Sequence, residues 1–269
     1  MHPILFKIGP LAIHSYGVML ALSFILGIFI AVRLGKKRGI DENEIVNIGF
    51  IIIISSIVGA RLFYVLFHMS EFQGRWLYTF WPVQRDGSVG LGGLILLGGF
   101  LTAFISSTVY IIYKKLNFWK LADSIAPGIA IGIFFTRIGC YLNGCCFGKA
   151  CSPALGVIFP PHSAAHSVMG SVPLYPTQLY SSFYGLLIFG ILLWIDRKIR
   201  FDGLNIGIFL ILYGIARFTV DFLRYYENQM FVIGGLGFNQ VVSLSMLLAG
   251  LVMIFLQWRA AKAPHPIKS

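Results

Sequence analysis

The sequence predicts an all-α, polytopic integral membrane protein, and three observations lead to that prediction. The 269 residues are 57% hydrophobic and only 12% charged, whereas soluble domains carry about 25% charged residues. Seven apolar blocks approach the length of a bilayer crossing. The basic residues gather in alternate loops between those blocks. Because a soluble core cannot account for so little charge, we expect a chain that crosses the membrane seven times.

The expected spans follow the apolar blocks and form a single membrane domain over residues 1–269. No charged n-region, apolar h-region and small-residue cleavage site precede the first block, so we interpret it as a retained span. The loops leave no room for a sizeable soluble domain. The expected spans are residues 14–33, 45–67, 89–113, 121–143, 176–195, 205–222 and 237–257.

The net charge of +11 is explained by membrane topology. One set of alternate loops holds 13 of the 21 basic residues and the opposite set holds five. The positive-inside rule then predicts an external N-terminus and a cytoplasmic C-terminus. We expect attraction to anionic membrane lipids and no nucleic-acid partner. The 13 residues are Arg33, Lys36, Lys37, Arg38, Lys114, Lys115, Lys120, Arg197, Lys198, Arg200, Arg259, Lys262 and Lys268.

Three arginines, Arg61, Arg137 and Arg217, remain inside or at the ends of apolar blocks. A central arginine costs about 2.5–3.5 kcal/mol on translocon scales. Snorkelling or a structural ion pair is one explanation, and Asp221, four residues after Arg217, could form such a pair. The other explanation is phosphate, because the planar guanidinium donates two parallel hydrogen bonds to phosphate oxygens. The hypothesis from the residues is a phospholipid-binding cavity.

All four cysteines, Cys140, Cys145, Cys146 and Cys151, lie within twelve residues at the end of the fourth span and in the following loop. Their spacing matches no common zinc or iron–sulfur pattern, so we expect no metal and no cofactor. Three interpretations stay open. Cys145 or Cys146 could pair with Cys151 in an oxidising exterior, the cysteines could be small packing residues, or Cys140 could be a reactive thiol beside Arg137.

The stretch RIGCYLNGCCFG, residues 137–148, resembles the signature of the prolipoprotein diacylglyceryl transferase family. Seven further segments match in order, so the resemblance covers nearly the whole chain: SYGVMLAL, GARLFYVLF, GGLI, ADSIAPGIAIG, YPTQLY, ARFTVDFLR and FNQVVSLSMLLAG. It implies a multi-pass transferase of the bacterial cytoplasmic membrane. Such an enzyme moves the diacylglyceryl group of phosphatidylglycerol to the lipobox cysteine thiol of a prelipoprotein signal peptide. A thioether forms and glycerol phosphate is released.

The resemblance also implies roles for particular residues. Arg137 is expected to contact the lipid phosphate. Arg217, Tyr16 and Asp221 are expected to act in catalysis, although the family usually has glutamate at the position of Asp221. The remaining expected substrate-binding residues, to which we add the intramembrane Arg61, are Asn143, Gly144, Gly148, Gly92, Gly93, Gln178 and Tyr180.

Several titratable positions of the family differ in this chain. Leu91 stands where the family has a histidine that is often proposed as the base. Cys140 and Cys145 replace an asparagine and a glutamate, and Tyr175 and Ser181 stand where histidine and glutamate are common. Two alternatives therefore accompany the transferase prediction: a paralogue with another acceptor, and a non-enzymatic lipid-binding or transport protein. A redox or metal protein rests on the cysteines alone.

Overall fold

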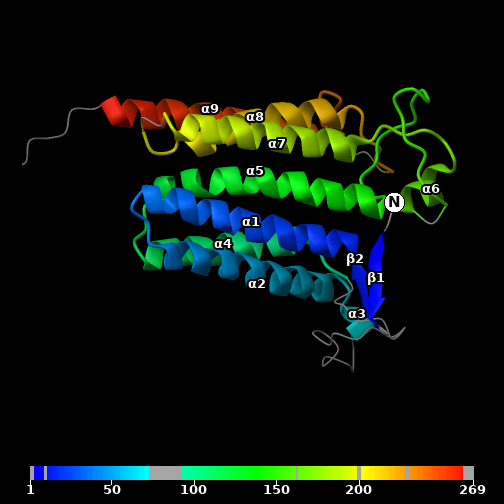
Figure 1. Ribbon diagram of the computed structural model, residues 1–269, viewed down its shortest axis with the longest axis horizontal. Coiled ribbons are helices and arrows are strands. Elements are labelled where there is room, and N and C mark those ends of the chain that lie inside the picture. The colour runs from blue at the N-terminus through cyan, green and yellow to red at the C-terminus, as the bar shows by residue number, and fades with distance from the viewer. Residues whose placement is uncertain are drawn as a thin grey trace, which may run out of the picture.

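Seven long helices form a bundle in the computed structural model, which describes residues 3–8, 11–72, 93–161, 163–198, 201–227 and 231–262 (Figure 1). Each is long and apolar enough to cross a bilayer, since 18 residues at 1.5 Å per residue already give about 27 Å. The predicted number of spans is confirmed, and the ends of the helices differ from the expected bounds by up to seven residues. The helices are α1 (Ser15–Lys37), α2 (Glu42–Phe67), α4 (Leu96–Tyr113), α5 (Phe118–Asn143), α7 (Thr177–Asp196), α8 (Leu204–Asp221) and α9 (Phe238–Lys262).

Short elements precede or connect the long helices, and none of them was predicted. Strands β1 (Ile4–Ile8) and β2 (Leu11–His14) form an antiparallel hairpin ahead of α1. Strands β3 (Phe231–Ile233) and β4 (Leu236–Gly237) form a second hairpin ahead of α9. The short helices α3 (Met69–Phe72) and α6 (Ala164–Met169) follow α2 and the cysteine segment. They are too short to change the predominantly helical class.

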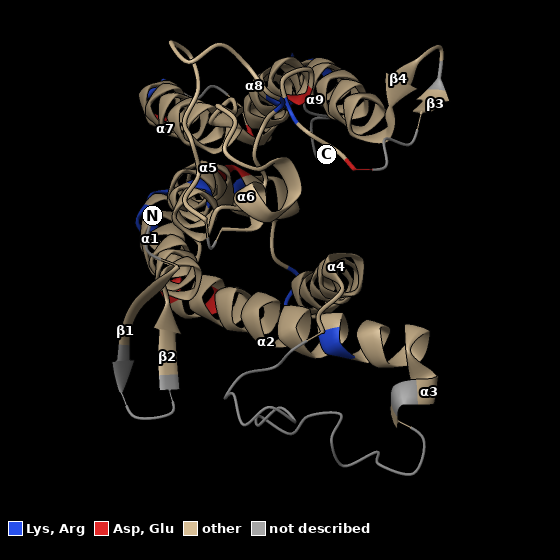
Figure 2. Ribbon diagram, turned by 90° about the vertical axis from the view of Figure 1, so that its right-hand side faces the viewer, with Lys and Arg blue, Asp and Glu red and all other residues tan. Residues whose placement is uncertain are grey.

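The long helices lie in three groups, seen from the side in Figure 1 and end-on in Figure 2. Helices α1 and α5 form the middle, α2 and α4 lie on one side of them, and α7, α8 and α9 lie on the other. The strongest pairings are α1 with α5, α8 with α9, and α2 with α4. Apolar side chains such as Phe100, Phe104 and Ile112 of α4 are exposed on the outside, as expected for a surface that faces lipid.

The two ends of the bundle differ. We call the end with α6 and the β1–β2 hairpin the α6 end (Figure 1). The opposite end carries the last turn of α1, with Lys36 and Lys37, and that of α9, with Arg259 and Lys262, and we call it the basic end. The described chain begins at the α6 end and finishes at the basic end, as an odd number of spans requires. Which end faces the cytoplasm stays a prediction.

Glycines allow the two middle helices to touch. A Cβ atom on Gly128 of α5 would lie 2.6 Å from the carbonyl oxygen of Gly27 on α1. The absence of side chains at both positions permits close backbone packing, as in other membrane helix pairs. Towards the α6 end, a Cβ on Gly139 would lie 3.3 Å from Cδ2 of Tyr16. The close approach therefore brings the start of α1 against the last turn of α5.

A buried carboxylate fixes the basic end. Asp123 of α5 is fully buried and accepts hydrogen bonds from the backbone N–H groups of Gly203 (2.8 Å) and Ile206 (2.9 Å). These donors lie at the start of α8, where no side chain of α8 itself caps the helix, so Asp123 satisfies N–H groups that would otherwise lack partners. Arg38, after α1, forms an ion pair with Asp196 at the end of α7. Both contacts tie α8 and α7 to the middle helices.

Candidate functional site

Topology brings most of the predicted site residues to the α6 end. Arg137 lies near the end of α5, Arg217 lies near the end of α8, and Tyr16 is the second residue of α1. Gln178 begins α7 beside them. Because alternate helices run in opposite directions, the ends of α5 and α8 meet the starts of α1 and α7 (Figure 1). Residues from distant parts of the sequence therefore share one end of the bundle.

Arg137 and Arg217 face the same tyrosine. Tyr184 of α7 is buried and lies within electrostatic range of both guanidinium groups. Its ring meets that of Tyr213 on α8 edge-on, with centroids 6.0 Å apart, and Tyr213 also lies within range of Arg137. Within the described residues Arg137 has no hydrogen bond or ion pair. The two arginines predicted from the sequence therefore form one cationic region with aromatic walls.

Only one of the two terminal nitrogens of Arg217 has a hydrogen-bond partner among the described residues. Its Nη2 donates to the hydroxyl of Tyr226 (3.0 Å) and lies 3.4 Å from Oδ1 of Asp221. The predicted pair of Arg217 and Asp221 is present, but Nη1 of Arg217 is buried without a hydrogen-bond partner among the described residues. A buried charged donor without a partner costs more than the roughly 1–3 kcal/mol of a neutral one. An anion bound at Nη1 would remove that cost.

Tyr226 is the centre of this network. Its hydroxyl donates to Oδ1 of Asp221 (2.5 Å) and accepts from Arg217 and from Nδ2 of Asn239 (3.0 Å). Burial, with the hydrogen bond to Asp221 added, raises the pKa of Tyr226, so the hydroxyl remains protonated at neutral pH. The side chain of Asp221 is only 1% exposed. Tyr226 therefore joins the end of α8 to the start of α9 and fixes the orientation of Arg217.

The cysteines follow a tight turn at the end of α5. Gly144 ends the helix in the left-handed conformation (φ 73°), and Cys146 also has a positive φ of 63°. The start of α7 holds this turn, because Nε2 of Gln178 donates to the carbonyl of Cys145 (2.7 Å) and Oγ1 of Thr177 donates to that of Cys146 (2.9 Å). These contacts between α7 and the cysteine turn could not be predicted from the residue pattern.

Three of the four thiols come together. The sulfur atoms of Cys140, Cys145 and Cys146 lie within 4.8 Å of one another. Tyr16 lies within electrostatic range of all three and of Arg137. Hydrogen bonds from the sulfurs of Cys140 and Cys145 lower the pKa of the Cys146 thiol, and Arg224 and Arg137 lower it further. We call Cys140, Cys145 and Cys146 the thiol cluster; it adjoins the arginines.

All four cysteines are free thiols. The disulfide of Cys145 or Cys146 with Cys151, which the sequence left open, is not formed. The sulfur of Cys151 instead donates to the carbonyl of Pro173 (3.7 Å). Cys151 therefore stands apart from the thiol cluster.

Arg61 lies in a different layer from the other two arginines. It is 7% exposed, its Nη1 donates to the carbonyl of Gly93 (3.2 Å), and its guanidinium lies over the rings of Tyr64 and Phe72. Helix α2, which carries it, lies across α1 and α5 from α8 (Figure 2). Gly93 has a φ of 66°, and a Cβ there would lie 2.5 Å from the Tyr64 ring. Gly92 and Leu91 lie outside the described residues.

The other predicted substrate-binding residues mainly shape the turn and its surroundings. A Cβ on Gly148 would lie 2.7 Å from the carbonyl oxygens of Tyr175 and Leu223, so the glycine permits three chain segments to meet. Asn143 interacts with the Cys145 thiol. Tyr180 packs against the core shared by α5, α7 and α8, next to Tyr184. None of these contacts tests a role in substrate binding.

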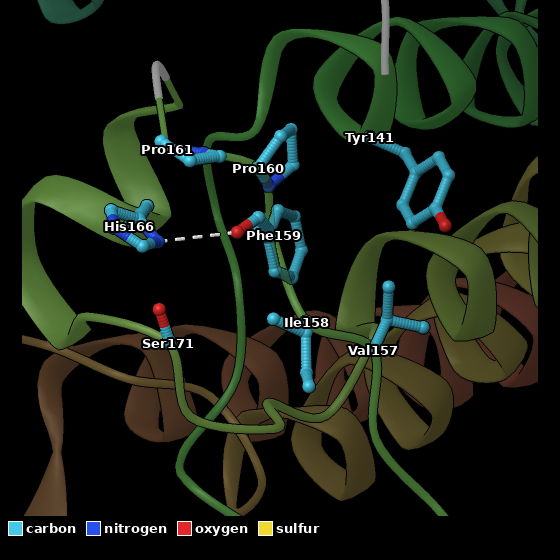
Figure 3. A pocket seen from close by; sticks show the side chains of 8 residues that line it. All are labelled: Tyr141, Val157, Ile158, Phe159, Pro160, Pro161, His166 and Ser171. Atoms are coloured by element: carbon cyan, nitrogen blue, oxygen red, sulfur yellow. Dashed lines mark hydrogen bonds between the residues drawn. The ribbon is translucent and has the colours of Figure 1, made fainter.

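A cavity of about 420 Å³ lies beyond the end of α5 (Figure 3). Figure 3 shows Tyr141 on one side, His166 on the other, and Nδ1 of His166 directed at the carbonyl of Phe159 at 3.3 Å. Its walls are mostly apolar and contain neither Arg137 nor Arg217. The cavity is therefore separate from the cationic region. Its lining residues are Tyr141, Val157, Ile158, Phe159, Pro160, Pro161, His166 and Ser171.

Sequence reasoning missed four polar residues of the site: Tyr184, Tyr213, Tyr226 and Asn239. Tyr213 lies four residues before Arg217, on the same face of α8, and that spacing could have been noticed. Tyr226 lies between α8 and α9, in a segment whose fold the apolar pattern does not predict. Asn239 lies inside the predicted seventh span, but its residue type alone does not indicate a contact with Tyr226. Tyr184 carries no signal beyond being a tyrosine in an apolar span.

Arginines inside a helical bundle are functional-site candidates in polytopic membrane proteins. The sequence model described as prolipoprotein diacylglyceryl transferase matches residues 3–256. The chain belongs to this family. It is a membrane transferase with prolipoprotein diacylglyceryl transferase activity, which is the first step of lipoprotein maturation.

Individual relatives are similar over nearly their whole lengths. Phosphatidylglycerol–prolipoprotein diacylglyceryl transferase 2 of Clostridium perfringens is 31% identical over 258 residues, covering 94% of this chain and 94% of the relative. The corresponding transferase of Erwinia tasmaniensis is 33% identical, with 96% and 92% covered. That of Geobacter sulfurreducens is 32% identical, with 97% of each chain covered. The family therefore accounts for the whole seven-helix bundle.

Proposed function

We propose that this chain transfers the diacylglyceryl group of phosphatidylglycerol to the lipobox cysteine of a prelipoprotein, and that Arg137 and Arg217 bind the lipid phosphate. The names of the relatives state the lipid donor and the protein acceptor. The observation that carries the residue assignment is the buried Nη1 of Arg217, which has no partner among the described residues while Nη2 is held by Tyr226. A phosphate oxygen would satisfy Nη1.

The reaction is an alkyl transfer in which charge develops on a phosphate ester. The acceptor thiolate attacks the glycerol carbon next to the phosphate, a C–S bond forms, and the C–O bond breaks. The bonding pair leaves with glycerol phosphate. Two fixed guanidinium groups stabilise this developing charge, and one such donor can contribute about 2.7–4 kcal/mol. The rings of Tyr184 and Tyr213 lie near the guanidinium group of Arg137.

The thiolate requires an electropositive neighbourhood or a metal, because Leu91 offers no base. Arg137 supplies positive charge beside the thiol cluster. Tyr16, 37% exposed at the edge of the site, is placed to contact the acceptor. Asp221 acts through Tyr226 by fixing Arg217. In this arrangement the phospholipid enters from the surrounding bilayer, with the α6 end on the external side of the cytoplasmic membrane.

Complementation tests this proposal. Wild type, Arg137→Ala and Arg217→Ala are expressed in bacteria depleted of their own diacylglyceryl transferase, with Cys151→Ala as a matched control outside the site. Wild type and Cys151→Ala should restore prelipoprotein modification, and the two arginine variants should not. Purified protein with phosphatidylglycerol and a lipobox peptide should yield the thioether by mass spectrometry. If well-expressed wild type binds phosphatidylglycerol but forms no thioether, the lipid-binding alternative replaces the transferase.

A further inference from the structure

The thiol cluster has the dimensions of a zinc site. The three sulfurs lie within 4.8 Å of one another, and sulfurs bound to zinc at about 2.3 Å in tetrahedral geometry lie about 3.8 Å apart. Small side-chain rotations would close that difference. A disulfide could join only two of the three thiols. The adjacent Cys145 and Cys146 have Cα atoms about 3.8 Å apart, below the usual disulfide range of about 4.4–6.8 Å.

The backbone of the cluster is held in an unusual conformation. Cys146 has a φ of 63°, which costs a non-glycine residue roughly 1–2 kcal/mol. Hydrogen bonds from Thr177 and Gln178 to the carbonyls of Cys146 and Cys145 hold this turn from α7, and the N–H of Cys145 donates to the carbonyl of Cys140 (3.1 Å). The turn therefore directs three side chains to one point before any ligand binds.

The surroundings suit a metal–thiolate group with an open position. Zinc with three thiolates carries one net negative charge, and Arg137 and Arg224 both lie within electrostatic range of Cys146. Cys140 is buried, whereas Cys145 and Cys146 are half-buried. One side of the cluster thus faces outward. Three protein ligands with a fourth position open to another group are typical of catalytic zinc sites.

We propose that Cys140, Cys145 and Cys146 bind Zn²⁺ and that the acceptor thiol occupies the fourth coordination position as a thiolate. The identity of this acceptor rests on the proposed function. On binding, the thiol gives its proton to water. Its sulfur electron pair then forms the C–S bond while the C–O bond breaks, and the glycerol phosphate leaves beside Arg137. The zinc keeps its oxidation state, and it takes over the activation that a base at position 91 would provide.

Metal binding can be measured without activity. Reduced, metal-free full-length protein in detergent is titrated with Zn²⁺ and with Co²⁺ under anaerobic conditions. Wild type and Cys151→Ala should bind one equivalent and show thiolate-to-cobalt charge transfer. Cys140→Ser, Cys145→Ser and Cys146→Gly should lose binding. Glycine relieves the positive φ at position 146, so this variant should keep the thermal stability of wild type, and its loss of metal would not reflect unfolding.

A lipobox peptide tests the fourth position. The peptide with its lipobox cysteine should shift the visible spectrum of the Co²⁺-loaded protein. A control peptide with serine in place of that cysteine should leave the spectrum unchanged. Absence of stoichiometric Zn²⁺ binding, binding that survives all three cluster variants, or identical spectra with both peptides would each overturn the proposal. Thioether formation by metal-free wild type would overturn the zinc step and leave the transferase assignment intact. Metal binding with no thioether formed by zinc-loaded protein would instead contradict the transferase assignment and the acceptor step together.

Discussion

Removing one hydroxyl, with Tyr226→Phe, tests whether Arg217 must be held in place. The Tyr226 hydroxyl contacts Arg217 (3.0 Å), Asp221 (2.5 Å) and Asn239 (3.0 Å). Without it, the buried carboxylate of Asp221 keeps, among the described residues, only Arg217 at 3.4 Å. The guanidinium should turn towards Asp221 and away from the lipid phosphate.

The magnitude follows from the two charged partners. A hydrogen bond to a charged group is worth about 1.5–3 kcal/mol, and the direct approach of Arg217 to Asp221 recovers part of what the pair loses. A net loss of about 1.5–3 kcal/mol in transition-state stabilisation corresponds to a fall of about 10- to 150-fold in kcat/KM. Most of the loss should appear in kcat, because charge on the phosphate develops as the C–O bond breaks.

The assay follows thioether formation by purified protein in phosphatidylglycerol nanodiscs with a lipobox peptide. Tyr225→Phe is the matched control: its ring stacks on Phe147 with centroids 5.5 Å apart, and phenylalanine keeps that contact. Tyr225→Phe should retain wild-type kinetics. Equal kcat/KM for Tyr226→Phe and wild type would refute the positioning role, and a fall in thermal stability alone would assign Tyr226 to folding only.

Three further predictions concern other parts of the bundle. Arg137→Lys should lower kcat/KM by about 10²-fold in the same assay, because a lysine cannot offer two parallel donors to a phosphate. Wild-type rates would contradict the binding of the lipid phosphate by Arg137. Gly93→Ala should lower the free energy of unfolding by roughly 1–3 kcal/mol, since its φ is 66° and the new Cβ meets the Tyr64 ring. The control Gly190→Ala has open space around the new Cβ and should leave the free energy of unfolding unchanged. Asp123→Ala removes the cap of α8, so it should lower the free energy of unfolding by about 1–2 kcal/mol and lower the melting temperature. It should leave kcat/KM of the folded protein unchanged. A loss of kcat/KM with an unaltered melting temperature would be inconsistent with a purely structural cap.

The seven spans could be predicted from the sequence because the bilayer sets their length and composition. Their ends could not, since hydropathy does not detect where a helix is capped or where it breaks off inside an apolar block. Helix α2 begins at Glu42, not at 45, because the Asp41 side chain accepts from the N–H of Asn43 (2.8 Å). The third span begins at Leu96, not at 89. The short hairpins have too few residues to give a periodic signal.

The candidate site was predictable only where charge is conspicuous. Three arginines stand out equally in the apolar blocks, yet only Arg137 and Arg217 share a region, and Arg61 binds Gly93 in another layer. Hydropathy detects burial but does not assign neighbours, so it could not separate Arg61 from the others. The expected role of Gln178 in substrate binding stays a prediction, and the sequence did not indicate that its amide nitrogen would donate to the carbonyl of Cys145 in the cysteine turn.

Two positions that differ from the family signature, Cys140 and Cys145, lie together in the thiol cluster. Leu91 removes a titratable group, while Cys140 and Cys145 add thiols where the family has asparagine and glutamate. In the sequence these look like independent losses of polar function. In the structure the sulfurs of Cys140, Cys145 and Cys146 meet beside Tyr16 and Arg137, which is where the proposed reaction brings an acceptor thiol to the lipid phosphate. On the zinc proposal, the metal takes the place of a base at position 91, because a thiol bound to zinc needs no separate base to remain a thiolate.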